Sequence, residues 1–272
     1  MNEKLIPAGD ARVKPLQGLA PWVGGKRQLA KRLIRRFEMF PHHCYAEPFI
    51  GMGGVFLRRP TRAAVEAIND WSEDVTTLFR VVQRHPDALI QELTWRIGSR
   101  ADFLRLADQD PAGLTDIERA ARFAFLQYTA FGGKPHTRSF GRSAVCKSGW
   151  TPERIFALLR AAHDRLSGVH IERLPYDRFI ALYDRPNTLF YLDPPYWGCE
   201  DYYGRNLFER ADFERLAMIL RGLKGAFVLS INDTPEIREL FAWAQIDEEA
   251  LTYTVNEAGP TRVTELVIST RR

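Results

Sequence analysis

The residues best suited to chemistry stand in one short segment, Asp193-Pro194-Pro195-Tyr196. The apolar run Thr188–Leu192 before it predicts a buried strand, and α/β sheets place their ligand sites at the carboxyl ends of strands. Two consecutive prolines stiffen the backbone and leave carbonyls without a competing local N–H. The segment therefore offers one carboxylate, several acceptors and one aromatic face, which suits a flat ring that bears an amine. A Pro-rich surface turn is the alternative interpretation.

A second candidate site follows the strand that we expect over residues 44–49. Gly51, Gly53 and Gly54 let a backbone approach a ligand closely, and we expect a helix to begin after them. Asp70 comes nineteen residues after Gly51, near the spacing at which an acidic residue binds a ribose hydroxyl in dinucleotide sites. Phe56 stands where GxGxxG has its third glycine, which disfavours a pyrophosphate. The pattern predicts a nucleoside-containing cofactor, with a ligand-free tight turn as the alternative.

Basic residues are concentrated in two tracts, although the net charge of the 272 residues is only +4. Residues 12–36 contain eight Lys or Arg and no acid. Residues 128–152 also lack acids and contain Lys134, Arg138, Arg142 and Lys147. Such tracts in a nearly balanced chain predict a localised surface that faces phosphates. Solvated helix and loop faces are the alternative.

The composition disfavours several other classes of protein. Three widely spaced cysteines, Cys44, Cys146 and Cys199, form neither a zinc nor a disulfide pattern, so we expect no metal and a reducing cytoplasm. No apolar run approaches the roughly 18 residues that span a membrane, and the N-terminus lacks the apolar core of a signal peptide. We therefore expect a cytoplasmic protein with no membrane partner.

The elements that must position these residues alternate between strands and helices. We expect a helix over 28–40, strands at 44–49, 64–68, 169–174, 188–192 and 226–231, and a final antiparallel hairpin from 251–255 and 263–269. Seven strands in this order predict an α/β fold with a doubly wound, mostly parallel sheet. The helical segment 72–160 interrupts the sheet and is expected to form an inserted domain. The predicted domains are 20–71 plus 161–272, and 72–160, with residues 1–19 flexible.

Four motifs in this chain together resemble those of the Dam-type DNA adenine methyltransferases, the group that carries DPPY after its recognition domain. They are Trp22-Val23-Gly24-Gly25-Lys26, Glu47–Phe56, Ile68-Asn69-Asp70 and Asp193–Tyr196. The resemblance spans roughly residues 20–270, includes the closing strand Thr264–Ile268, and is similar in detail to phage-borne members. It implies a Rossmann-like sheet, S-adenosyl-L-methionine as methyl donor and site-specific methylation of adenine N6 in double-stranded DNA, as in restriction-modification systems.

The resemblance also implies a role for each matching residue. Asp193 and the Pro194 carbonyl would accept the two hydrogens of the adenine amine, and Tyr196 would stack on a base flipped out of the duplex. The implied cofactor-binding residues are Trp22, Lys26, Glu47, Phe49, Gly51, Gly53, Asp70 and Asp193. Tyr176 or Phe179 would supply an aromatic ring beside the cofactor adenine, with core packing as the alternative for both.

The inserted segment is implied to read the DNA. Phe131 matches the aromatic residue that the family inserts into the duplex, and Lys134, His136, Arg138, Arg142 and Lys147 are the implied DNA-binding residues around it. Gly132–His136 departs from the Asn-Gly-Leu-x-Arg pattern of GATC-reading members, and Pro21 replaces a common lysine. Both departures count against a GATC target. We expect a monomer or a weak dimer on DNA.

Two other functions stay open from the sequence. The rRNA guanine-amine methyltransferases and the glutamine methyltransferases of release factors also carry DPPY or NPPY, but they usually lack the WxGGK opening and the large insertion. The other alternative is a DNA-binding relative whose cofactor site has decayed. Intact Asp70, Asp193 and Tyr196 argue against that alternative.

Overall fold

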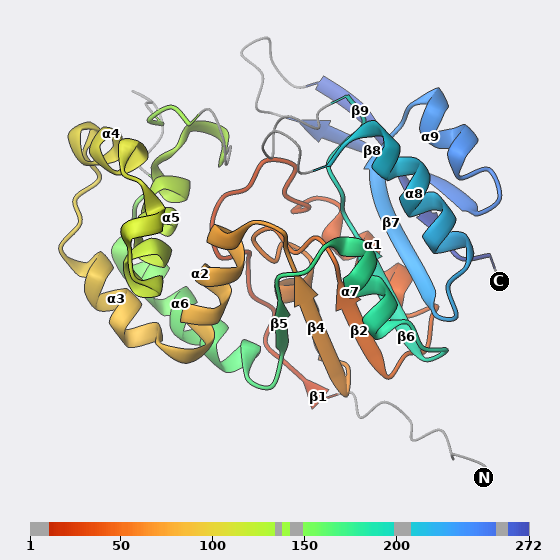
Figure 1. Ribbon diagram of the computed structural model, residues 1–272, viewed down its shortest axis with the longest axis horizontal. Helices are drawn as coiled ribbons and strands as arrows, with labels where there is room; N and C mark the ends of the chain where they lie inside the picture. The colour runs from red at the N-terminus through yellow and green to blue at the C-terminus, as the bar shows by residue number, and fades with distance from the viewer. Residues whose placement is uncertain (1–10, 134–137, 142–148, 199–207, 254–260, 272) are drawn as a thin grey trace.

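The computed structural model describes residues 11–133, 138–141, 149–198, 208–253 and 261–271. A seven-stranded sheet lies at its centre, in the order β5-β4-β2-β6-β7-β9-β8 (Figure 1). The strands are β2 (Cys44–Glu47), β4 (Val65–Asn69), β5 (His170–Glu172), β6 (Thr188–Leu192), β7 (Ala226–Asn232), β8 (Gln245–Tyr253) and β9 (Thr261–Ser269). Strand β9 is antiparallel to both of its neighbours, and the other pairs are parallel. The predicted fold class and the closing hairpin are confirmed.

Alternate residues of the strands enter two hydrophobic cores, one on each face of the sheet. Tyr45 and Ile68 face the core that contains α1 (Ala30–Phe37). Their neighbours Ala46 and Ala67 face the core that contains α7 (Tyr176–Tyr183) and α8 (Arg210–Arg221). Figure 1 shows α7 and α8 in front of the sheet, with α9 (Pro235–Leu240) beside β8. Apolar residues on both faces explain why β6 is buried along its whole length.

The expected helical segment is present and lies beside β5 (Figure 1). It contains α2 (Glu73–Arg84), α3 (Pro86–Thr94), α4 (Arg100–Asp108), α5 (Asp116–Thr129) and α6 (Pro152–Leu166). Thr115 and Glu118 form a capping box that begins α5. Buried apolar residues of these helices continue the core on the α1 face of the sheet. The division of the chain into two domains stays a prediction.

The prediction of a helix after the glycines is wrong. The chain makes turns from Gly51 and then one 3-10 turn, η1 (Phe56–Arg58), before β3 (Thr61–Arg62). Gly51 and Gly53 have φ of 48° and 71°, which do not continue into a helix. Pro60 follows so closely that a longer helix has no room. The segment 51–54, called the glycine loop below, can therefore offer only its own backbone to a ligand, because no α-helix begins between it and β3.

The expectation of a flexible segment 1–19 is wrong for its second half. Ala11–Arg12 forms β1 and pairs with β3. The backbone N–H of Leu16 donates to Leu57 at 2.7 Å, and that of Leu19 donates to Met52 at 2.9 Å. Leu19 is buried against the core. This segment is ordered because it pairs with and covers the glycine loop, whereas residues 1–10 lie outside the described part of the chain.

The first basic tract does not form one free cationic surface. Arg32 lies 2.5 Å from Glu249 of β8, and Arg36 forms an ion pair with Asp247 of the same strand. These pairs hold α1 against the edge strand of the sheet. The prediction of a phosphate-facing surface from residues 12–36 therefore loses part of its basis.

A buried ion cluster joins the helical segment to the sheet. Glu66 of β4 lies 2.5 Å from Arg165 of α6 and 2.8 Å from Arg59, and Glu66 and Arg165 are almost fully buried.

We expect Arg165→Gln to lower the free energy of unfolding by about 3 kcal/mol, because it leaves a buried carboxylate with less compensation. Arg160→Gln on the same helix breaks an exposed pair with Asp87 and should cost less than about 1 kcal/mol. Denaturant unfolding of both variants is the measurement, and equal costs would contradict the prediction.

Candidate active site

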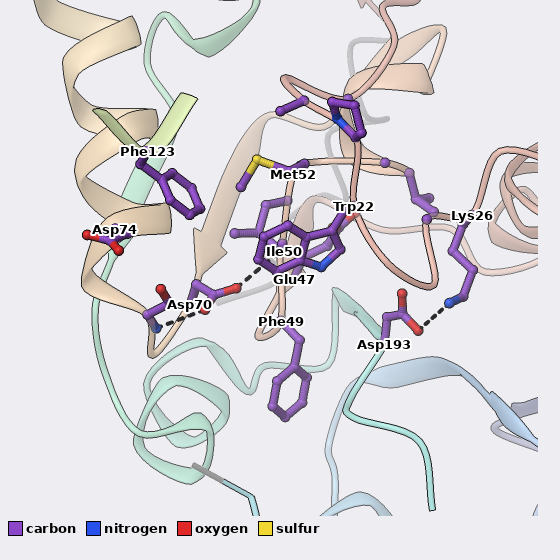
Figure 2. A pocket seen from close by; sticks show the side chains of 18 of the residues that line it. Trp22, Lys26, Glu47, Phe49, Ile50, Met52, Asp70, Asp74, Phe123 and Asp193 are labelled. Atoms are coloured by element: carbon purple, nitrogen blue, oxygen red, sulfur yellow. Dashed lines mark hydrogen bonds and ion pairs between the residues drawn. The ribbon is translucent and has the colours of Figure 1, made fainter. Parts of the chain in front are cut away.

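The carboxyl ends of three neighbouring strands meet where the strand order reverses between β2 and β6. Glu47 ends β2, Asp70 follows β4 and Asp193 follows β6. All three carboxylates line one cavity of about 690 Å³. Its wall also includes Trp22, Lys26, Phe49 and Gly51, so the structure brings together most of the predicted cofactor residues. Figure 2 shows Asp70 and Asp193 on opposite sides of the Trp22 indole.

Asp193 is held by groups from the first motif and from β7. Lys26 Nζ lies 2.7 Å from Asp193 Oδ1 (Figure 2), and the Ser230 hydroxyl donates to the same oxygen at 3.2 Å. The Ser230 hydroxyl also forms a hydrogen bond with the Tyr191 hydroxyl inside the sheet, at 2.8 Å. Burial raises the pKa of Asp193 to about 6, with Lys26 opposing the rise and the charge of Glu265 adding to it. Asp193 is thus mainly ionised at neutral pH.

The turn Asp193–Tyr196, which the resemblance predicts to be catalytic and which is called the catalytic turn below, is also held by hydrogen bonds from neighbouring elements. The hydroxyl of Tyr196 accepts a hydrogen bond from Lys26 at 3.0 Å and donates one to Glu265 of β9. The backbone N–H of the next residue, Trp197, donates to the side-chain oxygen of Asn232 at 2.9 Å, and the side-chain NH₂ of Asn232 donates to the Trp197 carbonyl at 3.0 Å. Two prolines and these contacts make the turn rigid. Pro195 lines the cavity, and Pro194 is buried.

Asp70 is built into the glycine loop. Its two carboxylate oxygens accept the backbone N–H of Gly51 at 3.0 Å and that of Ser72 at 2.9 Å. Burial raises the pKa of Asp70 to about 6, and these two N–H donors oppose the rise. Each carboxylate oxygen keeps a further lone pair. Asp70 can therefore accept hydrogen bonds from a ligand in the cavity while it fixes the loop.

Gly51 is needed where the loop meets the first motif. A Cβ at this position would lie 2.8 Å from Trp22 Nε1, and the φ of 48° disfavours other residues. Gly53, with a φ of 71°, would bring a Cβ to 3.0 Å from Leu57. These contacts set the indole of Trp22 directly against the loop. The first motif and the glycine loop therefore form one wall of the cavity.

Glu47 is the most deeply buried carboxylate of the cavity wall. Its side chain accepts a hydrogen bond from the Tyr45 hydroxyl at 2.5 Å. Burial raises the pKa of Glu47 to about 8, and the charge of Asp193 adds to the rise, while the Tyr45 hydrogen bond and Arg59 oppose it. Glu47 therefore carries a proton at neutral pH in this structure. A cation in the cavity would favour its ionised form.

An aromatic cluster closes one side of the cavity. Phe49 packs against Tyr176 and Phe208, with ring centroids 5.6 and 5.9 Å apart, and both phenylalanines line the cavity. Tyr176 contacts Phe208 at 5.7 Å and donates to Asp212 at 3.0 Å. Phe179 is fully buried and packs on Tyr183, so the core-packing alternative holds for it. Tyr176 keeps its predicted role as a proposal.

The predicted DNA-binding residues fall into two groups. Phe131 lies two residues after the end of α5 and is 51% exposed. Arg138 is turned inward: its Nε donates to Gln127 at 3.2 Å, its guanidinium lies 5.4 Å from the Phe123 ring, and it lines the cavity. Burial lowers the pKa of Arg138 to about 10. Lys134, His136, Arg142 and Lys147 lie outside the described residues.

Ser230, Asn232 and Glu265 contact the catalytic turn and were not predicted from the sequence as site residues. Ser230 and Asn232 are the two polar residues at the end of the otherwise apolar strand β7, and Glu265 precedes the buried apolar residues Leu266–Ile268 in β9. A polar residue in a strand that is buried on both faces is a usable signal, because burial of a polar group requires a partner. Phe208, which lines the cavity, was also missed. It stands outside any motif.

The described part of the chain contains no group of three or more His, Cys, Asp or Glu side chains arranged to hold a metal ion. Within the same residues, no helix is long and apolar enough to cross a membrane.

A cavity at the switch point of a doubly wound sheet is where α/β proteins bind their ligands. Residues 22–255 match the model of the D12 class N6 adenine-specific DNA methyltransferases. The chain belongs to this family. The predicted resemblance is confirmed, and the alternatives of an rRNA or a protein methyltransferase are not supported.

Similar proteins include Type II methyltransferases and DNA adenine methylases. The Type II methyltransferase M1.LlaDCHI of Lactococcus lactis subsp. cremoris is 28% identical, covering 93% of this chain and 95% of its own. The Type II methyltransferase M.CviBI of Paramecium bursaria Chlorella virus NC1A is 22% identical, covering 83% and 86%. The DNA adenine methylase of Haemophilus influenzae is 24% identical, covering 89% and 88%.

The raised pKa of Glu47 predicts how stability depends on pH. A carboxyl whose folded-state pKa lies near 8 stabilises the fold while it is protonated, and this contribution is lost as pH rises toward that value. This loss begins above the ordinary glutamate pKa of 4.5, and between about pH 6.5 and about pH 8, where Asp70 and Asp193 are already mainly ionised, the free energy of unfolding should fall by at most about 1.4 kcal/mol per pH unit. Glu47→Gln should remove this fall, because glutamine stays neutral. Denaturant unfolding across this range checks it.

Glu248→Gln is the control, because Glu248 is exposed and pairs with Arg238 on the surface. It should keep the pH dependence of the parent. A parent-like slope in Glu47→Gln would show that Glu47 ionises normally in the folded protein.

Proposed function

We propose that this DNA adenine-N6 methyltransferase takes its methyl group from S-adenosylmethionine and transfers it to an adenine flipped out of double-stranded DNA. The observation that carries the proposal is the convergence of Asp70 and Asp193 on one cavity. Asp70 suits the ribose of a nucleoside, and Asp193 suits an amine on a flat ring. A site that holds both groups fits a nucleoside methyl donor beside an adenine.

The residues of the cavity fit S-adenosylmethionine. A volume of about 690 Å³ lies within the usual range for small-molecule sites. Asp70 would accept hydrogen bonds from the ribose hydroxyls, and Glu47 would face the amino group of the methionine part. Phe49 and Tyr176 would contact the adenine. When bound, the cofactor supplies a methyl group on a positively charged sulfur, which makes that carbon open to attack.

Asp193 and the Pro194 carbonyl prepare the nucleophile. The exocyclic amine of adenine is weakly nucleophilic because its lone pair is delocalised into the ring. Accepting its two hydrogens localises that lone pair on nitrogen. Lys26 and Ser230 both use Oδ1 of Asp193, and Oδ2 has no hydrogen-bond partner among the described residues. The adenine amine can therefore reach Oδ2 without displacing Lys26.

Capture of the base is assigned to the catalytic turn and the helical segment. An amine inside a duplex cannot reach Asp193, so the base must leave the stack. Tyr196 would then stack on it. Phe131, half exposed after α5, would enter the duplex, and the loop that carries Lys134, His136, Arg142 and Lys147 would contact phosphates or base edges. Arg138 lies in the cavity wall, which favours contact with the extruded nucleotide over an outer phosphate. We propose that the protein acts on DNA as a monomer or a weak dimer.

We expect Asp193→Ala to lower the single-turnover rate of methyl transfer by at least about 10²–10³, the loss typical of one preorganised transition-state group. Duplex binding should stay largely intact, because the only part of the DNA that Asp193 would contact is the reacting amine. Tritium transfer to unmethylated genomic DNA gives the rate, and a gel-shift titration gives the binding. Asp233→Ala is the matched control, since Asp233 follows β7 as Asp193 follows β6 but pairs with Arg238. Near-normal turnover in Asp193→Ala would refute the mechanism.

We expect Asp70→Ala to weaken binding of S-adenosylmethionine by about 1.5–3 kcal/mol, because hydrogen bonds to a charged acceptor are lost. Titration calorimetry with the protein alone measures this directly. Asp102→Ala in α4 lies outside the cavity wall and should leave the affinity unchanged. Equal affinities of Asp70→Ala and the parent would remove Asp70 from the cofactor site.

A further inference from the structure

The ammonium of Lys26 has a complete set of acceptors. It can donate three hydrogen bonds, and three oxygens surround it: Asp193 Oδ1 at 2.7 Å, the Gly24 carbonyl at 2.9 Å and the Tyr196 hydroxyl at 3.0 Å. The Lys26 side chain is only 4% exposed. Because an ammonium cannot accept, the Tyr196 oxygen must be the acceptor in its contact with Lys26. The O–H of Tyr196 is then directed to Glu265.

Glu265 reaches this position because β9 runs against the rest of the sheet. It lies opposite Asn232 in the β7–β9 register, at the end of β7 that meets the catalytic turn. Glu265 is 1% exposed and precedes the buried apolar residues Leu266, Val267 and Ile268 of β9. A buried carboxylate is costly unless it is paired and hydrogen-bonded. Its contact with Tyr196 gives Oε1 of this carboxylate a hydrogen-bond donor.

We propose that Glu265 is a positioning residue for methyl transfer, which anchors the Tyr196 hydroxyl and so fixes the ring of the catalytic turn beside Asp193. This inference rests on the proposed role of Tyr196 as the face on which the target base stacks. Glu265 does not touch the base or the methyl donor. It acts through Tyr196.

A fixed ring has a direct catalytic benefit. A tyrosine ring on a turn loses rotational freedom when a base stacks on it, and this loss opposes base capture. Two hydrogen bonds on one hydroxyl, from Lys26 and to Glu265, impose that loss before the base arrives. The same contacts couple the ring to the carboxylate that receives the amine, through Lys26. Stacking face and acceptor are thus held in one geometry.

Glu265 also contributes to the charge around Asp193. The charged and titratable groups near Asp193 include Lys26, Glu47, Tyr191, Tyr196 and Glu265, with the Ser230 hydroxyl in contact. Lys26 lowers the pKa of Asp193, and Glu265 raises it. Glu265→Gln should therefore lower the pKa of Asp193. The acidic limb of the kcat/KM profile should then move to lower pH, which a purely structural role would not cause.

A double-mutant cycle tests the proposal. Parent, Tyr196→Phe, Glu265→Gln and the double variant are compared by single-turnover tritium transfer from labelled S-adenosylmethionine to unmethylated phage genomic DNA. Tyr196→Phe keeps the stacking ring and removes only the hydroxyl. We expect each single variant to lose about tenfold in rate, the lower end for a hydrogen bond to a charged group, and the double variant to be no slower than either one. A parent-like rate in Tyr196→Phe, or independent losses that multiply in the double variant, would overturn the proposal.

The matched control is Glu249→Gln on the neighbouring strand. Glu249 pairs with Glu265 in the β8–β9 register but bonds Arg32 instead of Tyr196, so its variant should keep the parent rate and pH profile. If Glu265→Gln does not fold by thermal unfolding, Tyr196→Phe decides alone, because it leaves Glu265 in place. Full activity in Asp193→Ala would instead refute the proposed function, whatever the cycle shows.

Discussion

The ion pair between Lys26 and Asp193 joins the two halves of the active site. Lys26 belongs to the first motif, near the start of the chain, and Asp193 follows a strand more than half the chain away. Coulomb attraction between them is strong because Lys26 is almost fully buried. The same ammonium holds the Gly24 carbonyl and the Tyr196 hydroxyl. One cation thus aligns the first motif, the carboxylate that we propose accepts the amine hydrogens, and the ring that we propose stacks on the base.

Around this pair, the cavity uses burial to adjust its carboxylates. Glu47, Asp70 and Asp193 all have raised pKa values for the same principal cause, loss of solvent. The groups that oppose this rise in pKa differ: an ammonium lies beside Asp193, two backbone N–H groups donate to Asp70, and a tyrosine hydroxyl donates to Glu47. Asp70 and Asp193 stay mainly ionised near neutral pH, whereas Glu47 holds a proton. Three similar side chains therefore offer different properties to a ligand.

Much of this could be predicted from the sequence, for identifiable reasons. The apolar run before Asp193 and the glycines after β2 are local signals, so the strands and the positions of Asp70 and Asp193 followed from pattern alone. The prediction of a helix after the glycines was wrong because it did not take into account that Pro60 follows them so closely. Strand β8 begins at Gln245, six residues before the expected start, because its acidic residues Asp247 and Glu249 hid the alternation. Those residues pair with arginines of α1. Glu265 could not be placed, since its contact with Tyr196 depends on strand order and direction.

The place of β9 in the sheet has a consequence for how the enzyme is made. It is the last strand among the described residues, yet it lies between β7 and β8, which precede it in the sequence. During synthesis, β7 and β8 must wait with unpaired edges until residues up to Ser269 have left the ribosome. Such edges are prone to pairing with other chains. The same strand delivers Glu265 to the catalytic turn, so a growing chain cannot complete this active site before the insertion of β9 completes its sheet.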